Sequence, residues 1–202
     1  MMTSLVVTTA QSVWRLASDM LILASKSPRR KELLKLLNQE FIVDAVDIPE
    51  EFDLSQGLLV AIEQLAYRKA LPIFKLHPQD MVIGADTIVV NHGEIFGKPT
   101  DYHDAKRMLK ALSGNTHQVI TGVSIISKQK SYSFHEVTDV TFYALSEEDI
   151  DDYITREQPF DKAGAYAIQE GAAQFVKCIN GDFYNIVGLP VGHLSQVLKH
   201  LK

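Results

Sequence analysis

Short apolar runs and stretches with helical periodicity alternate along most of the chain. The apolar runs predict strands at residues 21–24, 41–46, 81–90, 117–127 and 131–143. Apolar positions spaced by three or four predict helices that begin after residue 27, and at 58–70, 101–112, 146–154 and from 190 onward. This alternation is typical of an α/β protein.

Two antiparallel pairs are expected in the second half of the chain. The strands 117–127 and 131–143 are joined by a short polar turn, which predicts the first pair. Residues 175–179 and 183–187 flank Asn180 and Gly181, and this dipeptide predicts a hairpin with a type I′ turn.

The first strand and the first helix meet at a pattern that suits an anion. Ser27 is a candidate helix cap, and Pro28 is favoured in the first turn of a helix. The free N–H groups of that turn, together with Arg29 and Arg30, concentrate positive charge at one point. A phosphate chain is the ligand that we expect there.

Composition favours a globular protein that binds small ligands. The chain has 202 residues, of which 46% are hydrophobic, and this is enough for one domain with a sizeable core. A net charge of −5 argues against a general nucleic-acid surface, so the arginines near residue 29 are expected to serve a local pocket. The single cysteine, Cys178, excludes an internal disulfide, and we expect a buried apolar thiol in a reducing compartment.

The ends of the chain bear on localisation. No apolar stretch approaches the roughly 20 residues of a membrane span, and residues 1–19 make a poor signal peptide. Met20 directly precedes the first convincing strand, so we expect residues 1–19 to be a poorly ordered extension or a mispredicted start, and residues 20–202 to form a single domain.

Asp86 is the strongest candidate for chemistry. A carboxylate within an apolar strand requires a cation, a metal or a proton to transfer, although a buried aspartate that caps a neighbouring loop is an equal alternative. Thr87 beside it is a candidate donor to a base or a phosphate, or an ordinary strand threonine. Glu50 lies in an acidic loop after the second strand, and Glu50 with Asp86 suits a hard divalent cation.

Lysines near the ends of elements are candidates for the same cleft. Pro72 is expected to stop or kink the helix at 58–70, which leaves Lys69 in its last turn. Lys98 lies in a rigid Gly-Lys-Pro turn, and Lys162 in a loop that contains glycine. Most surface lysines are only solvated, so these positions remain candidates.

Several common sites are excluded by the motifs. The histidines show no metal-ligand spacing such as HExxH, and the chain contains neither GxxxxGK[ST] nor GxGxxG. Ser25 and Ser27 are not in a GxSxG pattern, so they are phosphate ligands or helix caps rather than nucleophiles.

Seven blocks together resemble the Maf family of nucleoside triphosphate pyrophosphatases. They are LASKSPRRKELL, LAYRKA, IGADTIVV, FGKP, LSGNTHQVITGV, DKAGAYAIQEG and INGDFYNIVGLP, and they follow the family's order from Met20 onward. The resemblance implies an α/β fold of the Maf and inosine-triphosphatase kind, with an elongated, twisted mixed sheet flanked by helices and two lobes around a cleft. It also implies hydrolysis of a nucleoside triphosphate to the monophosphate and pyrophosphate, with Mg²⁺ or Mn²⁺, in the cytoplasm.

The resemblance also assigns roles to individual residues. Asp86 would accept a proton from water, and Glu50 with Asp86 would bind the metal. Lys69 and Lys98 would hold the triphosphate. Arg30 is expected to hold phosphate or to support the structure, and Ser25 remains a phosphate ligand or a helix cap. The branch that acts on dTTP and UTP is marked by three positions that this chain retains. They are Arg29, Thr87 and Gln169.

Two positions depart from the family's pattern. Ala167 and Glu170 stand where glycine is common, and a lost glycine is expected to restrict the loop while Glu170 adds negative charge beside Gln169. These departures keep open the alternative of a nucleotide-binding regulator of cell division without turnover. A pyrophosphatase for inosine-type triphosphates is a further alternative, because those enzymes share a related fold. A homodimer is expected from the resemblance alone.

Overall fold

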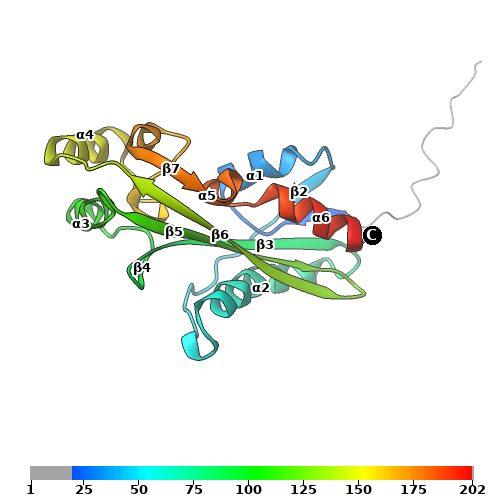
Figure 1. Ribbon diagram of the computed structural model, residues 1–202. Coiled ribbons are helices and arrows are strands. Elements are labelled where there is room, and N and C mark those ends of the chain that lie inside the picture. Colours follow the sequence, from blue (N-terminus) through cyan, green and yellow to red (C-terminus); the bar gives the residue numbers. More distant parts are fainter. Residues whose placement is uncertain (1–19, 202) are drawn as a thin grey trace, which may run out of the picture.

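The computed structural model describes residues 20–201, and these residues build one elongated, mixed sheet with helices on both faces (Figure 1). The expectation for residues 1–19 lies outside the described residues. The strands are β1 (Leu21–Leu23), β2 (Phe41–Val43), β3 (Met81–Asn91), β4 (Glu94–Phe96), β5 (Thr116–Ile126), β6 (Ser131–Phe142) and β7 (Val176–Asn180). The helices are α1 (Pro28–Lys35), α2 (Leu58–Leu76), α3 (Tyr102–Leu112), α4 (Glu147–Glu157), α5 (Phe183–Val187) and α6 (Val191–Leu201), with 3₁₀ turns at Leu54–Gln56, Ala163–Ala165 and Gly171–Phe175.

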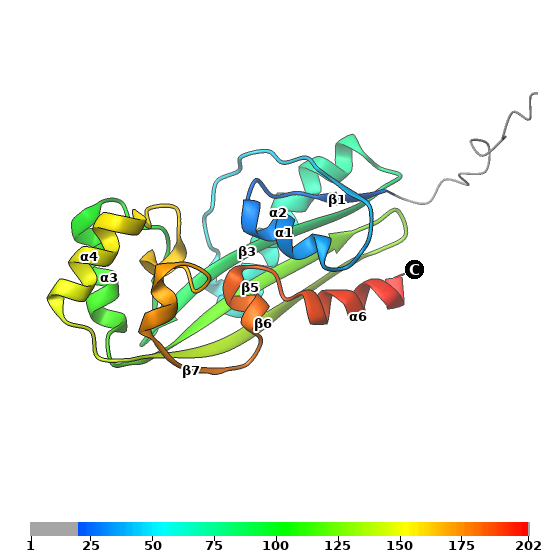
Figure 2. The same ribbon diagram turned by 90° about the horizontal axis from the view of Figure 1, so that it is seen from above.

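The sheet has the strand order β2-β1-β3-β5-β6-β7, and β4 pairs with β3 beside this path. Strand β1 is parallel to both β2 and β3, whereas β5, β6 and β7 join by antiparallel pairing. The predicted α/β class and the antiparallel pair of β5 and β6 are therefore confirmed. The long strands β3, β5 and β6 form the body of the molecule, and α3 and α4 lie together at one end of it (Figures 1 and 2).

Helix α2 lies very close to the sheet because two glycines face it. A Cβ on Gly84 in β3 would collide with the carbonyl oxygen of Ala66, and one on Gly122 in β5 would lie 2.5 Å from that of Ile62. Side chains at these positions would push the helix away from the sheet. The close approach lets Lys69 of α2 reach Asp86 in the middle of β3.

Helix α2 differs from its prediction in length. It continues to Leu76 with Pro72 inside it, so Lys69 lies within the helix rather than in its last turn. The apolar positions Ala70 and Ile73 are completely buried, and this packing holds the helix together across the missing Pro72 N–H group.

The predicted hairpin around Asn180 and Gly181 is wrong. Strand β7 pairs with β6, and residues 183–187 form helix α5 instead of a second strand. The Asp182 side chain accepts a hydrogen bond from the Tyr184 N–H group and so caps this helix, which ends at Gly188 with φ of 122°. A five-residue apolar run is too short for its periodicity to separate a strand from a helix.

One surface residue differs from its prediction. Cys178 lies exposed on the edge strand β7, so the prediction of a buried thiol is wrong.

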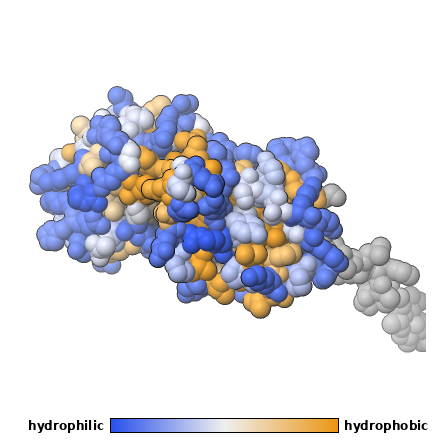
Figure 3. Space-filling model, turned by 90° about the horizontal axis from the view of Figure 1, so that it is seen from below, coloured by the Kyte–Doolittle hydropathy of each residue, from blue (hydrophilic) through white to orange (hydrophobic). Residues whose placement is uncertain are grey.

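Figure 3 shows an apolar region among hydrophilic side chains on the face seen from below, the side of the sheet that carries α2. Among residues 20–201, no helix is both long and apolar enough to cross a membrane.

Candidate active site

A pocket of about 540 Å³ opens between the amino-terminal end of α1, the middle of β3 and the loops that follow β4, α4 and α5. Its lining includes every residue that the sequence nominated for substrate or metal binding. These residues are Ser25, Arg29, Arg30, Glu50, Lys69, Asp86, Thr87, Lys98 and Gln169. Segments that are far apart in the sequence thus meet around a single cavity.

The start of α1 forms one wall of the pocket in the way that the sequence predicted. The Ser27 hydroxyl accepts a hydrogen bond of 3.4 Å from the Arg30 N–H group and caps the helix, and Pro28 occupies the first turn. The Ser25 hydroxyl accepts a bond of 3.3 Å from the Ser27 N–H group. Backbone donors and the positive end of the helix therefore face the pocket.

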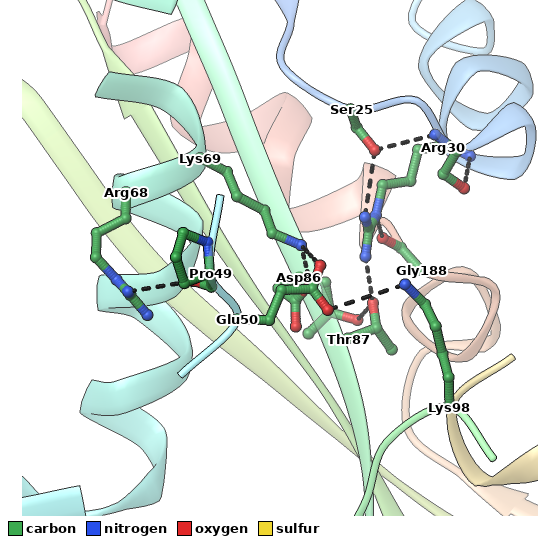
Figure 4. Close-up of polar contacts among 12 residues, drawn as sticks. Ser25, Arg30, Pro49, Glu50, Arg68, Lys69, Asp86, Thr87, Lys98 and Gly188 are labelled. Carbon is green, nitrogen blue, oxygen red and sulfur yellow. Dashed lines mark hydrogen bonds and ion pairs between the residues drawn. The ribbon is translucent and has the colours of Figure 1, made fainter. Parts of the chain in front are cut away.

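Arg30 is fixed by three separate oxygens. Its guanidinium donates to the Gly188 carbonyl at 2.8 Å, to the Thr87 hydroxyl at 2.9 Å and to the Ser25 hydroxyl at 3.3 Å (Figure 4). Burial lowers the pKa of Arg30, and attraction to Asp86 opposes this shift. The side chain is thus a partly buried cation held between α1, β3 and the residue that ends α5.

Lys69 joins the two carboxylates of the pocket. Its ammonium donates to Asp86 and, at 2.7 Å, to Glu50, while Lys98 lies 3.9 Å from the second oxygen of Glu50 (Figure 4). Asp86 is only 8% exposed, so its carboxylate depends on this pairing, and the alternative of a loop-capping aspartate is wrong. Burial raises the pKa of Glu50, but the hydrogen bond and charge of Lys69, with Lys98 and Arg30, outweigh it and lower the pKa.

Arg29 faces the loop that follows α4, on the other side of the pocket. Its guanidinium lies 3.5 Å from one oxygen of Asp161, whose other oxygen accepts a hydrogen bond of 2.6 Å from Lys162. Lys162 also lies 3.8 Å from Glu170. The sequence singled out Lys162 but not Asp161, and no periodicity could have paired Asp161 with Arg29 across so long a separation.

The two unusual residues near Gln169 fit the backbone. Ala167 is not among the described residues with positive φ, and Glu170 has an extended backbone with φ of −115°, so neither position requires glycine. The Ala167 N–H group donates to the Tyr153 hydroxyl at 3.2 Å. The charge of Glu170 is partly balanced by Lys162, which limits its effect on the neighbouring Gln169.

A buried aromatic group that the sequence did not single out supports this part of the wall. Tyr166 lines the pocket, and its hydroxyl is 2.9 Å from Nε2 of His117, which is 1% exposed. Burial lowers the pKa of His117 to about 4, so its imidazole is neutral near pH 7. The signal for this pair was weak, because a lone histidine in a strand carries no spacing pattern.

The donor chemistry of the pocket fits a hard divalent cation. Glu50 and Asp86 present carboxylate oxygens to one ammonium, and Mg²⁺ is commonly held by one or two carboxylates together with substrate phosphates. Within the described part of the chain, no group of three or more histidine, cysteine, aspartate or glutamate side chains forms an all-protein metal site. The residues therefore suit a metal that arrives with a phosphate ligand.

The fold and the pocket define an α/β protein with a cleft built for an anionic ligand. The fold is similar to that of the Ham1 protein of Staphylococcus aureus, with a TM-score of 0.53, 14% identity, and coverage of 91% of this chain and 100% of that one. The Ham1 protein of Coxiella burnetii is similar at a TM-score of 0.50 and 16% identity, with coverage of 91% and 100%. These likenesses confirm the expected fold.

The family is shown by sequence. The family model described as "Maf-like protein" matches residues 20–201, and the chain belongs to the Maf family. It is 48% identical over 178 residues to a dTTP/UTP pyrophosphatase of Bacillus cytotoxicus, and the matched region covers 88% of this chain and 93% of the relative. It is 49% identical over 181 residues to a dTTP/UTP pyrophosphatase of a Geobacillus species, with coverage of 90% and 97%.

Proposed function

We propose that this protein is a nucleoside triphosphate pyrophosphatase that hydrolyses dTTP, UTP and modified pyrimidine relatives to the monophosphate and pyrophosphate. The observation that carries the proposal is Asp86, a nearly buried carboxylate that lines the pocket between Lys69 and Arg30. A carboxylate that is costly to bury and is surrounded by cations suits water activation beside a phosphate chain. The relatives named above carry the same activity in their names.

In the proposed reaction, water attacks the α-phosphorus of the nucleotide. A new bond forms between the water oxygen and the α-phosphorus, and the bond from that phosphorus to the bridging oxygen of pyrophosphate breaks. Asp86 accepts the proton that the attacking water loses. Lys69, Lys98 and Arg30 stabilise the negative charge that develops on the phosphates, which is where such a site contributes most.

Selection of the base is assigned to three further residues of the pocket. Arg29, Thr87 and Gln169 line the same cavity, and these are the residues that the resemblance associates with the pyrimidine branch. The side-chain amide of Gln169 can both donate to and accept from a uracil-type edge. This arrangement favours a pyrimidine over the inosine-type purine alternative.

A divalent cation, Mg²⁺ or Mn²⁺, is part of the proposal. Glu50 and Asp86 would hold it together with substrate phosphates. When bound, such an ion neutralises phosphate charge and lowers the pKa of a bound water. Lys69 bonds to both carboxylates, so we expect Lys69 to orient them and to limit their mutual repulsion.

The proposal also concerns the setting of the reaction. We place the protein in the cytoplasm, as a homodimer that removes nucleotides from the cellular pool and does not bind nucleic acid. The net charge of −5 supports the last point. Light scattering of the purified chain tests the dimer.

A pyrophosphate-release assay over canonical triphosphates, with Mg²⁺ and with Mn²⁺, tests the function. We expect dTTP and UTP to be the best substrates and Asp86→Asn to lower kcat by at least about 100-fold. Asp139→Asn is the matched control, because Asp139 accepts a hydrogen bond from Gln118 on the neighbouring strand and is not among the residues that line the pocket. Its activity should equal that of the unchanged protein.

The outcomes separate the two classes of function. If Asp86→Asn is as active as the unchanged protein, Asp86 is not the proton acceptor. If no triphosphate releases pyrophosphate, the enzymatic proposal is wrong. Binding of UTP in a calorimeter without pyrophosphate release would then support the nucleotide-binding regulator.

A further inference from the structure

Two threonines lie directly opposite each other on neighbouring strands beneath the pocket. Thr87 in β3 is paired in register with Thr121 in β5, and their hydroxyl oxygens are 2.9 Å apart. Thr121 is completely buried and is not among the residues that line the pocket. It therefore acts on a ligand only through its neighbours.

The direction of these hydrogen bonds follows from counting donors. The Thr121 hydroxyl is 3.0 Å from the backbone carbonyl of Asn185, and because a carbonyl can only accept, Thr121 donates its single hydroxyl hydrogen there. In the contact between the two threonines, Thr87 must then be the donor. The Thr87 oxygen in turn accepts from the Arg30 guanidinium at 2.9 Å.

This series of hydrogen bonds leaves the Thr87 hydroxyl without a hydrogen to donate to a ligand. Its hydroxyl hydrogen points at Thr121, so the only capacity that remains toward the pocket is a lone pair. Phosphate oxygens at neutral pH also only accept, so Thr87 is unsuited to a phosphate and suited to a donor group of the base. The ring imide N–H of uracil and thymine is such a donor, whereas the corresponding ring nitrogen of cytosine accepts.

We propose that Thr121 is a positioning residue that turns Thr87 into a hydrogen-bond acceptor and thereby selects imide-bearing pyrimidines over cytosine. The inference rests on the proposed function and deepens it, because it explains how one side chain of the pocket reads the base. Asn185 contributes through its carbonyl, and its own side-chain amide fixes α5 by donating to the Val119 carbonyl at 3.0 Å and to the Thr138 hydroxyl at 2.9 Å.

Thr121→Val tests the proposal, because valine has the same shape and suits a strand but cannot accept a hydrogen bond. The hydroxyl of Thr87 is then free to rotate and to donate. We expect the ratio of kcat/KM for UTP to that for CTP to fall by about two- to tenfold, the range of one net hydrogen bond. Thr121→Ser keeps the hydroxyl, and the ratio should remain that of the unchanged protein.

The chain offers a control pair with the same geometry at an exposed position. Thr116 and Thr141 form the same kind of opposed pair between β5 and β6, with hydroxyl oxygens 2.8 Å apart and no place in the pocket lining. Thr116→Val should leave the ratio unchanged. Loss of stability alone would lower both rates together and leave their ratio constant, so the ratio reports positioning.

An unchanged ratio in folded Thr121→Val would overturn the inference. If that variant does not fold, Thr121→Ala provides the same measurement. Failure of the proposed function looks different, since the unchanged protein would then release no pyrophosphate from any triphosphate. In that case the ratio of the dissociation constants for UTP and CTP, measured by calorimetry, takes the place of the rate ratio, and it must fall in Thr121→Val for the inference to stand.

Discussion

The contact between Lys69 and Asp86 is expected to stabilise the fold as well as the site. Their side chains are 15% and 12% exposed, so both charges are largely removed from water. Breaking a fully buried ion pair costs about 3–5 kcal/mol, and a hydrogen bond to a charged group contributes about 1.5–3 kcal/mol. Because the pair borders a pocket that admits water, we expect Lys69→Met to lower the free energy of unfolding by about 2 kcal/mol.

A double-mutant cycle separates this coupling from other effects of each change. Urea denaturation would be measured for the unchanged protein, Lys69→Met, Asp86→Asn and the double variant. We expect a coupling energy of about 1.5–2 kcal/mol. Glu50, the second partner of Lys69 at 2.7 Å, is 48% exposed, and its contribution should stay below about 1 kcal/mol.

A second ion pair outside the pocket provides the comparison. Lys106 and Asp151 are 2.6 Å apart with side chains 22% and 39% exposed, so their coupling should be smaller than that of Lys69 and Asp86. If the free energies of the Lys69 and Asp86 variants add within about 0.5 kcal/mol, the reasoning is refuted. Asp86 would then be stabilised by Arg30 or by solvent rather than by Lys69.

Three further predictions concern pH, packing and metal. Burial lowers the pKa of His117 from 6.5 to about 4, so between these pH values the histidine is protonated in the unfolded chain but not in the folded one. The free energy of unfolding should therefore fall by about 3 kcal/mol as the pH drops from 6.5 to 4. His117→Gln should remove this pH dependence in urea denaturation. Gly84→Ala should cost several kcal/mol by thermal unfolding, since its Cβ would meet the Ala66 carbonyl, whereas Gly97→Ala has open space and should cost under about 1 kcal/mol. EDTA should abolish pyrophosphate release and excess Mg²⁺ should restore it, and release that persists in EDTA would contradict the metal proposal.

The sequence predicted the elements whose periodicity was long and clear. The run that became β3 and the helices capped by Asp101 and Ser146 appear where they were expected, because each carries either many apolar positions or an explicit cap. The short segment 183–187 failed because its shape depends on the cap from Asp182. The length of α2 was missed because burial of its last turns outweighs the cost of Pro72.

The candidate site was predicted as a set of residues but not as a set of contacts. The motif blocks and the acidic loop with Glu50 nominated the candidate side chains, and all of them line one pocket. The bonds from Arg30 to Gly188 and from Thr87 to Thr121 depend on strand register and on how α5 ends, which no local pattern encodes. The membership of the pocket lining could therefore be predicted from residue types and motifs, whereas the orientation of the side chains required the fold.

The two adjacent arginines of the SPRR segment, Arg29 and Arg30, have different environments, and we therefore expect them to have different roles. The Arg30 guanidinium donates hydrogen bonds to three oxygens and cannot turn toward a ligand without breaking these bonds. It therefore supplies a fixed positive charge. A fixed charge stabilises the negative charge that develops in the transition state without having to reorient during the reaction. Arg29 has a weaker contact with Asp161 at 3.5 Å and can exchange it for a ligand. Arg30→Lys should therefore lower kcat, because a lysine cannot reproduce three directed bonds, whereas Arg29→Lys should mainly change KM and the preference among bases.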